Sequence, residues 1–222
     1  MKSLYIDRRG RGTTRRGLVS ALMGLVVGSG LCAQALSAQT MTLGAAVASG
    51  KVSASVSGTG ASSGDSVKVT VAKTPAAGPG NLALTVPPGT RLASSDAGAQ
   101  SMVVSGVRGR MAGGNDLSYE PTSVITVGSR PVTYVLDAYC AEFEKENPSS
   151  STAFRVASQP DARLGCVLRQ ASAGNLSVEA TQAAVWIVTD AITFEHMSQK
   201  FDITSQDFAR ARAVAARCGP GR

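Results

Sequence analysis

Two short segments of the sequence carry side chains that can react with each other. Cys140 lies in the segment Ala-Tyr-Cys-Ala, and Gln182 lies further along in Thr-Gln-Ala-Ala-Val-Trp. A cysteine thiol held against a glutamine carboxamide can expel ammonia and form an internal thioester, because proximity makes the reaction intramolecular. A thioester stores an acyl group that reacts with amines. Cys140 and Gln182 are therefore the first candidates for a functional site.

The element that carries Cys140 is predicted to be a β-strand over residues 132–143. Successive side chains of a strand point to opposite faces, so Cys140 shares its face with every second residue before it. Those residues are mostly apolar: Val132, Tyr134, Leu136 and Ala138. We therefore expect Cys140 to face the core of the protein.

The element that carries Gln182 is predicted to be a helix from residue 178 to about 192, with Ser177 as its N-cap. This helix is apolar nearly all round, which is typical of a helix buried on most sides. A buried carboxamide without partners costs about 1–3 kcal/mol. Two interpretations are open. Gln182 hydrogen-bonds to the backbone of a neighbouring strand, or it meets Cys140 and has reacted with it.

The N-terminus has the layout of a secretory signal peptide over residues 1–38. A basic stretch with five arginines precedes an apolar run at residues 18–31, and a stretch of small residues follows at 33–38. The paired Arg15 and Arg16 also resemble a twin-arginine export signal. We therefore expect a secreted protein, extracellular or periplasmic, whose mature part is one domain over residues 39–222 with no membrane span.

The positive charge of the chain belongs mostly to this leader. The full sequence has 22 basic and 15 acidic residues, and the leader holds six of the basic residues and one of the acidic ones. The mature part then has 16 basic and 14 acidic residues, a net charge of +2. This near balance gives no indication of a nucleic-acid-binding protein.

The mature part has an odd number of cysteines: Cys140, Cys166 and Cys218. In an oxidising compartment an odd count leaves one thiol unpaired. Cys166 and Cys218 fall on the apolar stripes of two predicted helices, so a disulfide between them is natural and leaves Cys140 free. A disulfide of Cys140 with Cys166 or Cys218 stays open as the competing pairing.

The segments around Cys140 and Gln182 resemble the motifs of the bacterial surface thioester domains, also called TQXA domains. Tyr-Cys resembles the family's aromatic-Cys motif, and Thr-Gln-Ala-Ala followed by Val-Trp resembles its Thr-Gln-x-Ala motif. The resemblance covers roughly residues 81–218. It implies that Cys140 supplies the sulfur and Gln182 the acyl carbon of the internal bond.

The resemblance also implies a function. Such domains are β-rich with a helical subdomain, and they act as adhesins that couple covalently to amines on a surface or a protein. We therefore expect a non-catalytic adhesion or surface-attachment domain, with Tyr139, Thr181 and Trp186 next to the bond. The alternative is a non-reactive extracellular structural or binding module of the same fold without the thioester.

The two halves of the mature chain differ in composition and in the periodicity of their apolar residues, and together they predict an α+β fold. Residues 39–145 are rich in Val, Thr, Ser and Gly, with alternating runs separated by turns, which predicts an antiparallel β-sandwich or barrel-like sheet. The runs lie at 51–57, 66–73, 81–86, 100–107, 123–127 and 132–143. Residues 146–222 predict a three-helix subdomain, with helices from Ser158 to about Gln170, from Ser177 to about 192, and from Thr204 to Gly219.

Other candidate sites are weaker. Glu142, Glu144 and Glu146 could be the paired acids of a glycosidase, but the run Glu-Phe-Glu-Lys-Glu is more typical of a solvated strand end. His196 is the single histidine and has no nucleophile motif or zinc-ligand spacing near it. The Gly-rich stretch 58–64 lacks the Lys-Ser/Thr ending of a phosphate loop. We expect no metal and no cofactor.

Overall fold

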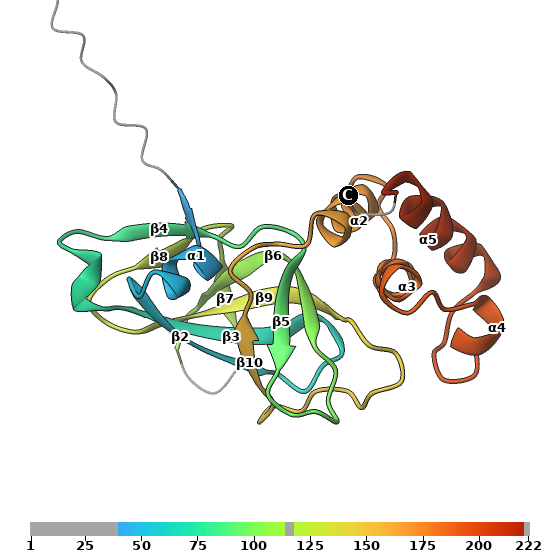
Figure 1. Ribbon diagram of the computed structural model, residues 1–222, viewed down its shortest axis with the longest axis horizontal. Coiled ribbons are helices and arrows are strands. Elements are labelled where there is room, and N and C mark those ends of the chain that lie inside the picture. The colour runs from blue at the N-terminus through green and yellow to red at the C-terminus, as the bar shows by residue number, and fades with distance from the viewer. Residues whose placement is uncertain (1–39, 114–117, 220–222) are drawn as a thin grey trace, which may run out of the picture. The chain divides into compact units, whose positions relative to one another are not determined.

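The computed structural model describes residues 40–113 and 118–219 (Figure 1). These residues belong to one compact unit that spans 39–222. The predicted signal peptide lies outside the described residues. The fold is α+β and consists mostly of β-sheet, as the sequence predicts.

Six strands close into an antiparallel barrel. Their order is β5-β10-β2-β3-β9-β6, and β5 pairs with β6 to complete the circle. Closure leaves no strand edge open to another chain along the paired part of the barrel. The six strands are β2 (Val52–Gly58), β3 (Ser63–Lys73), β5 (Thr90–Ser94), β6 (Met102–Met111), β9 (Val132–Cys140) and β10 (Ala153–Val156).

A second, smaller sheet and two short elements complete the β-rich part. Strands β1 (Met41–Thr42), β4 (Leu82–Thr85) and β8 (Ile125–Val127) form a three-stranded sheet in the order β1-β4-β8, in which β1 and β4 are parallel. Strand β7 (Tyr119–Pro121) pairs antiparallel with the last residues of β6. Helix α1 (Leu43–Ala48) follows β1, and a 3-10 turn spans Pro75–Ala77.

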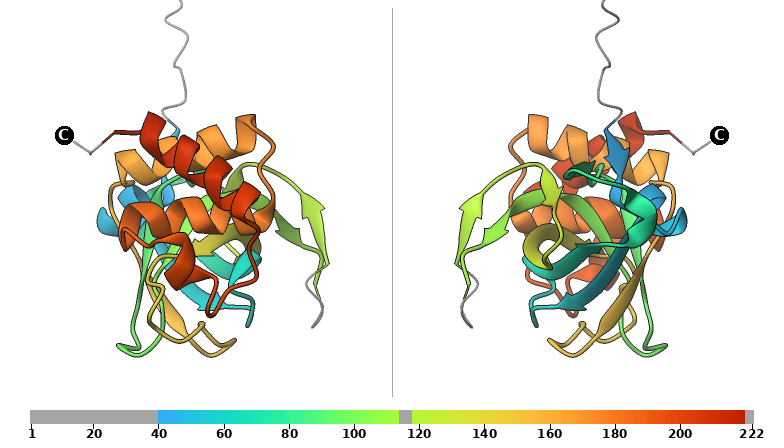
Figure 2. Two further views of the ribbon diagram at one scale, coloured as in Figure 1. Left: turned by 90° about the vertical axis from the view of Figure 1, so that its right-hand side faces the viewer. Right: turned by 90° about the vertical axis from the view of Figure 1, so that its left-hand side faces the viewer.

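Four helices follow β10 and pack on one another (Figures 1 and 2). They are α2 (Ala162–Ala173), α3 (Val178–Thr189), α4 (Phe194–Met197) and α5 (Ser205–Arg217). Helix α3 contacts both α2 and α5, and it also contacts β9 and β3 of the barrel. Helix α2 contacts β6. The barrel and the helices are therefore joined chiefly through α3 and β9, the two elements that carry Gln182 and Cys140.

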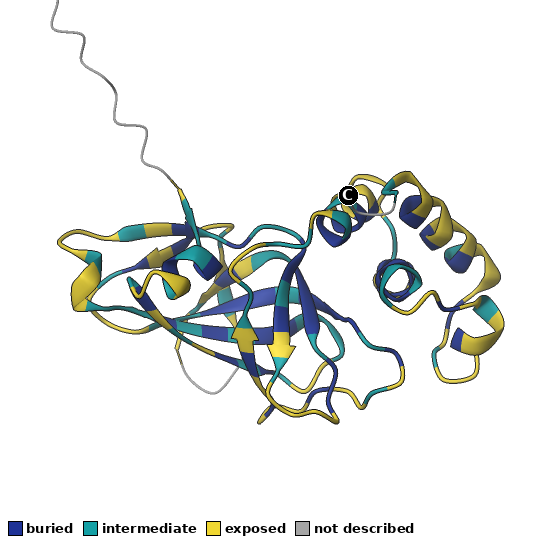
Figure 3. Ribbon diagram, in the orientation of Figure 1, coloured by how far each residue is buried: buried dark blue, intermediate teal, exposed yellow. Residues whose placement is uncertain are grey.

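Strand β9 is buried on both faces near its end (Figure 3). Its inward side chains join the main core inside the barrel, where Leu136, Ala138 and Cys140 are fully buried. Its outward side chains face the helices, and Tyr139 packs with Leu168 of α2 and others in a separate cluster. Cys140 thus faces the core, as strand alternation predicts.

Several predicted bounds are wrong. The helix expected from Ser158 begins at Ala162, because Asp161 caps it by accepting hydrogen bonds from the Arg163 and Leu164 amides at 3.0 Å. Pro160 disfavours helical backbone in the residue before it, which blocks the earlier start. The helix expected to end near residue 192 ends at Thr189.

The division at residue 145 is also too simple. Strand β10 lies beyond it in sequence, yet it is one of the six barrel strands, between β5 and β2. Strands β1, β5, β7 and β10 and the short helices α1 and α4 are not predicted from the sequence. The N-caps Ser177 and Thr204 are confirmed, since their hydroxyls accept hydrogen bonds from the Ala180 and Asp207 amides.

Candidate functional site

The side chain of Gln182 makes two hydrogen bonds to the main chain of Cys140. The Cys140 amide donates to Gln182 Oε1 at 2.9 Å, and Gln182 Nε2 donates to the Cys140 carbonyl oxygen at 2.8 Å. The exposed fraction is 0% for Cys140 and 1% for Gln182. The structure therefore brings together the two residues that the sequence singles out from separate motifs.

The barrel leaves room for Gln182 beside Cys140 because β3 does not reach as far as Cys140. Strand β3 pairs with β9 only as far as Ser63 opposite Tyr139. On the other side, Cys140 is in register with Met102 of β6, and the neighbouring Ala141 amide donates to the Ser101 carbonyl. The amide and carbonyl of Cys140 therefore point away from β6, to the edge that β3 has left open. Gln182 fills that edge.

This arrangement fixes the Gln182 carboxamide relative to the main chain of Cys140. Main-chain hydrogen bonds of a strand lie close to the plane of the sheet, whereas side chains project perpendicular to it. The carboxamide of Gln182 is bonded in the plane, and the side chain of Cys140 leaves the plane from the same residue. The Gln182 carboxamide and the Cys140 side chain therefore meet at the same residue of β9.

The sulfur itself contacts other groups in the structure. Cys140 Sγ lies 3.6 Å from Met102 Sδ and 3.9 Å from Asn147 Oδ1. A bond to Gln182 would replace these contacts of the sulfur.

The thiol is protonated at neutral pH. Burial, with a smaller contribution from the Glu142 carboxylate, raises the pKa of Cys140 from its ordinary value of 9.0 to about 12. A buried neutral thiol is a weak nucleophile, because the thiolate is the reactive form. Any reaction with Gln182 must therefore proceed slowly, and it gains its advantage from proximity rather than from activation of the sulfur.

Gln100 and Asn147 support the loop that follows Cys140, and the sequence analysis does not predict a role for them. Gln100 is 2% exposed; its Nε2 donates to Asn147 Oδ1 at 3.3 Å and its Oε1 accepts from the Glu142 amide at 3.1 Å. Both the nitrogen and the oxygen of the Gln100 carboxamide are thus hydrogen-bonded. Such a contact joins segments far apart in sequence, and no local motif could have indicated it.

Trp186 lies one turn after Gln182 on α3 within an aromatic cluster. Its ring centroid is 5.0 Å from that of Phe143 and 5.1 Å from that of Phe201, both in edge-to-face geometry. The indole nitrogen of Trp186 is buried and has no hydrogen-bond partner among the described residues. Aromatic side chains of this kind exclude water from their surroundings.

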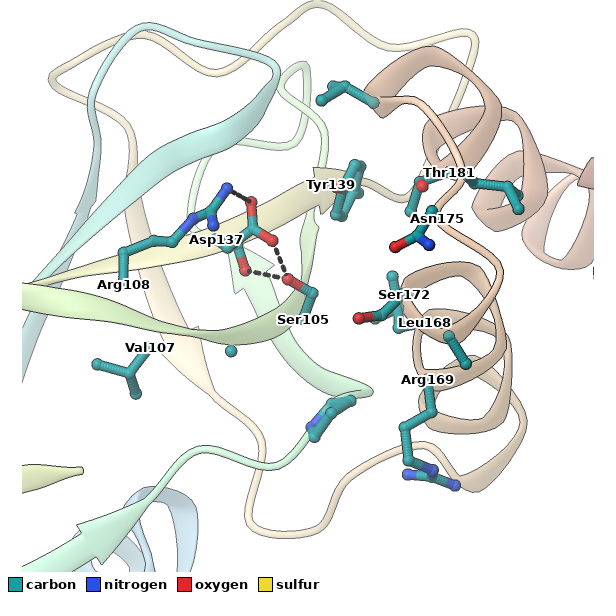
Figure 4. Close-up of a pocket in the computed structure, with 15 residues that line it drawn as sticks. Ser105, Val107, Arg108, Asp137, Tyr139, Leu168, Arg169, Ser172, Asn175 and Thr181 are labelled. Atoms are coloured by element: carbon teal, nitrogen blue, oxygen red, sulfur yellow. Dashed lines mark hydrogen bonds and ion pairs between the residues drawn. The ribbon is translucent and has the colours of Figure 1, made fainter. Parts of the chain in front are cut away.

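Tyr139 and Thr181 line a cavity of about 630 Å³ between the barrel and the helices (Figure 4). Tyr139 lies between the Asp137 side of the cavity and Thr181 on α3. Burial, with a contribution from Asp137, raises the pKa of Tyr139 to about 12. The barrel wall carries Asp137 in contact with the Ser105 hydroxyl and 3.6 Å from Arg108 Nη2. Both immediate neighbours of the Cys140–Gln182 pair therefore border this cavity.

The cysteine pairing is settled by the structure in favour of one alternative. Cys166 of α2 and Cys218, which follows α5, form a disulfide. Cys140 is the free cysteine of the described residues and is buried. The competing disulfides of Cys140 are therefore not formed.

The other candidates lie at the surface or make ordinary ion pairs. Glu144 is paired with His196 Nε2 at 2.8 Å and with Lys200 Nζ at 2.6 Å, and all three side chains are at least half exposed. Glu142 is paired with Lys145 at 2.8 Å. Within residues 40–113 and 118–219, no three His, Cys, Asp or Glu side chains gather in a group that could hold a metal ion. None of the helices in this part of the chain is long and apolar enough to cross a membrane.

Comparison of the chain with protein-family models, with curated proteins and with solved structures gives no match. The case for the site therefore rests on the geometry of Cys140 and Gln182 and on the two motifs around them.

Proposed function

We propose that the protein is a secreted adhesion or surface-attachment domain whose Cys140 and Gln182 form an internal thioester that couples to amines. The observation that carries this proposal is the pair of hydrogen bonds between the buried Gln182 carboxamide and the main chain of Cys140. It holds the acyl carbon beside the residue that bears the free thiol, while the other two cysteines are consumed by a disulfide.

The proposed bond forms without an added base or co-reactant. The sulfur of Cys140 attacks the carbonyl carbon of Gln182, and the carbon–nitrogen bond breaks. The thiol proton goes to the departing amide nitrogen, which leaves as ammonia. During the attack, negative charge develops on Gln182 Oε1, and the Cys140 amide that donates to this oxygen stabilises it.

Burial then protects the product. Cys140 and Gln182 are nearly inaccessible, and Trp186 and Phe143 cover the neighbouring turn of α3. A water-excluded site slows hydrolysis of a reactive acyl group. An amine that enters the site takes the acyl group from sulfur, so that Gln182 carries a substituted amide and Cys140 is a free thiol again.

A second function has one observation in its favour. Gln182 satisfies the main-chain groups of Cys140 where β3 ends, and that role alone accounts for a buried glutamine. The protein would then be an extracellular structural or binding module without the bond.

Amine labelling separates the two functions. The mature protein is incubated with methylamine, digested and mapped by mass spectrometry. The proposed function predicts a methylamide at Gln182 and at no other glutamine, with Cys140 newly available to a thiol reagent. Cys140→Ala is the matched control and should take up no methylamine. Absence of label at Gln182 in the wild-type protein would favour the non-reactive module.

A further inference from the structure

A cavity of about 320 Å³ lies next to the loop that follows Cys140. Its lining includes the aromatic residues Phe143, Trp186 and Phe201, together with Asn147. Asn147 is exposed, yet its Oδ1 lies 3.9 Å from the fully buried Cys140 Sγ. One surface side chain therefore reaches from this cavity to the sulfur.

The wall and the rim of this cavity differ in chemistry. The wall consists of the edge-to-face cluster of Phe143, Trp186 and Phe201. Such a wall fits an aliphatic chain, because it buries apolar surface without needing a hydrogen bond. The rim carries the carboxylates of Glu144 and Glu146.

An ammonium group already occupies the rim. Lys200 Nζ lies 2.6 Å from Glu144 Oε2 and 5.6 Å from the centroid of the Phe143 ring. A cation within about 6 Å of an aromatic face is attracted by the ring. The Glu144 carboxylate and the face of the Phe143 ring thus together bind the alkyl ammonium group of Lys200. Lys145, the other cation of the lining, is held by Glu142 at 2.8 Å.

We propose that this cavity is the entrance for the amine, and that Glu144 recognises the charge of an incoming alkyl ammonium in competition with Lys200. The inference rests on the thioester proposed above. The aromatic wall takes the alkyl chain. Displacement of Lys200 frees Glu144 Oε2 for the incoming ammonium, while Glu144 Oε1 stays paired with His196 Nε2.

The amine reacts with the thioester at the inner end of the entrance. The ammonium loses one proton to solvent and becomes a neutral amine. Its nitrogen attacks the Gln182 carbonyl carbon, the carbon–sulfur bond breaks, and the second proton goes to the sulfur. The products are an N-alkyl amide at Gln182 and the Cys140 thiol. To admit the chain, the Asn147 side chain must move away from the sulfur and give up its hydrogen bond from Gln100 Nε2.

The test compares a cationic with an uncharged nucleophile. 1,5-Diaminopentane is a doubly charged alkyl ammonium, and hydroxylamine is uncharged at slightly alkaline pH. The rate of adduct formation is followed by intact mass for the wild type, Glu144→Gln, Lys200→Gln and the control Glu120→Gln, which removes an exposed carboxylate on β7. Each protein is first weighed to establish that it has lost ammonia.

We expect Glu144→Gln to slow the reaction with 1,5-diaminopentane about two- to fivefold, the range of an exposed ion pair. Lys200→Gln should accelerate it by a similar factor. Hydroxylamine should react at the same rate with all four proteins, and Glu120→Gln should match the wild type with both reagents. Equal rates of all four proteins toward 1,5-diaminopentane, or equal effects on both reagents, would overturn the entrance while leaving the thioester in place. A wild-type protein that retains its ammonia would overturn both.

Discussion

Gln182 occupies, beside Cys140, the position that a neighbouring β-strand holds along the rest of β9. Strand β3 pairs with β9 as far as Tyr139, and the carboxamide of Gln182 supplies the next donor and acceptor. The same group is thus part of the barrel's hydrogen bonding and the proposed acyl donor. Thioester formation would remove Nε2 and leave the Cys140 carbonyl without this partner, so reaction and local stability are linked.

Removal of the Gln182 side chain should destabilise the protein strongly. Gln182→Ala leaves the buried amide and carbonyl of Cys140 unpaired, and each unpaired group costs about 1–3 kcal/mol. We expect the free energy of unfolding to fall by about 2–4 kcal/mol in urea denaturation. Gln170→Ala, an exposed glutamine of α2, is the matched control and should change it by less than about 0.5 kcal/mol. Similar small effects of both substitutions would contradict the role of Gln182 in the barrel.

Loss of the disulfide should loosen the helices. Cys166 and Cys218 are 52 residues apart, and a cross-link over a loop of this length restricts the unfolded chain by about 4 kcal/mol. We expect the double variant Cys166→Ser/Cys218→Ser to lose stability of this order in denaturant without reductant. A non-reducing peptide map should join these two cysteines; a peptide that joins Cys140 to either one would contradict the structure.

The junction between the barrel and α2 should not tolerate a side chain at Gly89. Gly89 has a φ of +92°, and a Cβ atom there would lie 2.3 Å from the Asp161 carbonyl oxygen and 2.6 Å from the Gly165 amide. Gly89→Ala combines backbone strain with a clash against main chain, so we expect a loss of more than about 2 kcal/mol.

Gly98→Ala is the control for this substitution. Gly98 is exposed, and a Cβ atom there meets nothing closer than 3.5 Å. We expect thermal unfolding of Gly98→Ala to resemble that of the wild type. If Gly89→Ala were equally stable, the close approach between α2 and the turn before β5 would be wrong.

The stability of the free-thiol form should depend on pH through Cys140. Burial raises the pKa of this thiol to about 12 from 9.0, so the folded protein keeps the proton to higher pH than the unfolded chain. Unfolding then releases a proton between these values. The contribution of Cys140 is therefore fully present below pH 9.0 and is lost as the pH rises toward about 12.

Denaturation after methylamine treatment, which frees the thiol, measures this dependence. The treated wild type should lose stability more steeply above pH 9.0 than Cys140→Ala does. Tyr139, whose pKa is raised to about 12, contributes in the same direction to both proteins. Parallel curves for the treated wild type and Cys140→Ala would show that the Cys140 thiol does not titrate as its burial requires.

The regular elements of the site could be predicted from the sequence because their patterns are local. Alternation in β9 put Cys140 on the core face, and the all-round apolar character of α3, with Ser177 as its cap, indicated a buried Gln182. The cysteine count favoured a free Cys140. Each of these depends only on residues within one element.

The contacts that complete the site could not be predicted, because they join distant segments. Strand β10 is four residues long and follows a serine-rich loop, so it lacks the length that alternation needs, yet it closes the barrel between β5 and β2. The early end of β3, which gives Gln182 its place, follows from strand register. The register between strands depends on the whole barrel, so it cannot be predicted from the sequence of any one strand.

The mass of the intact mature protein, measured without reductant, tests the central claim most directly. If Cys140 and Gln182 form the thioester, the wild type weighs one ammonia less than its sequence with one disulfide. Cys140→Ala should show only the disulfide and the substitution. A wild-type mass that the single disulfide explains in full would contradict the thioester, and Gln182 would then be a structural partner of β9 alone.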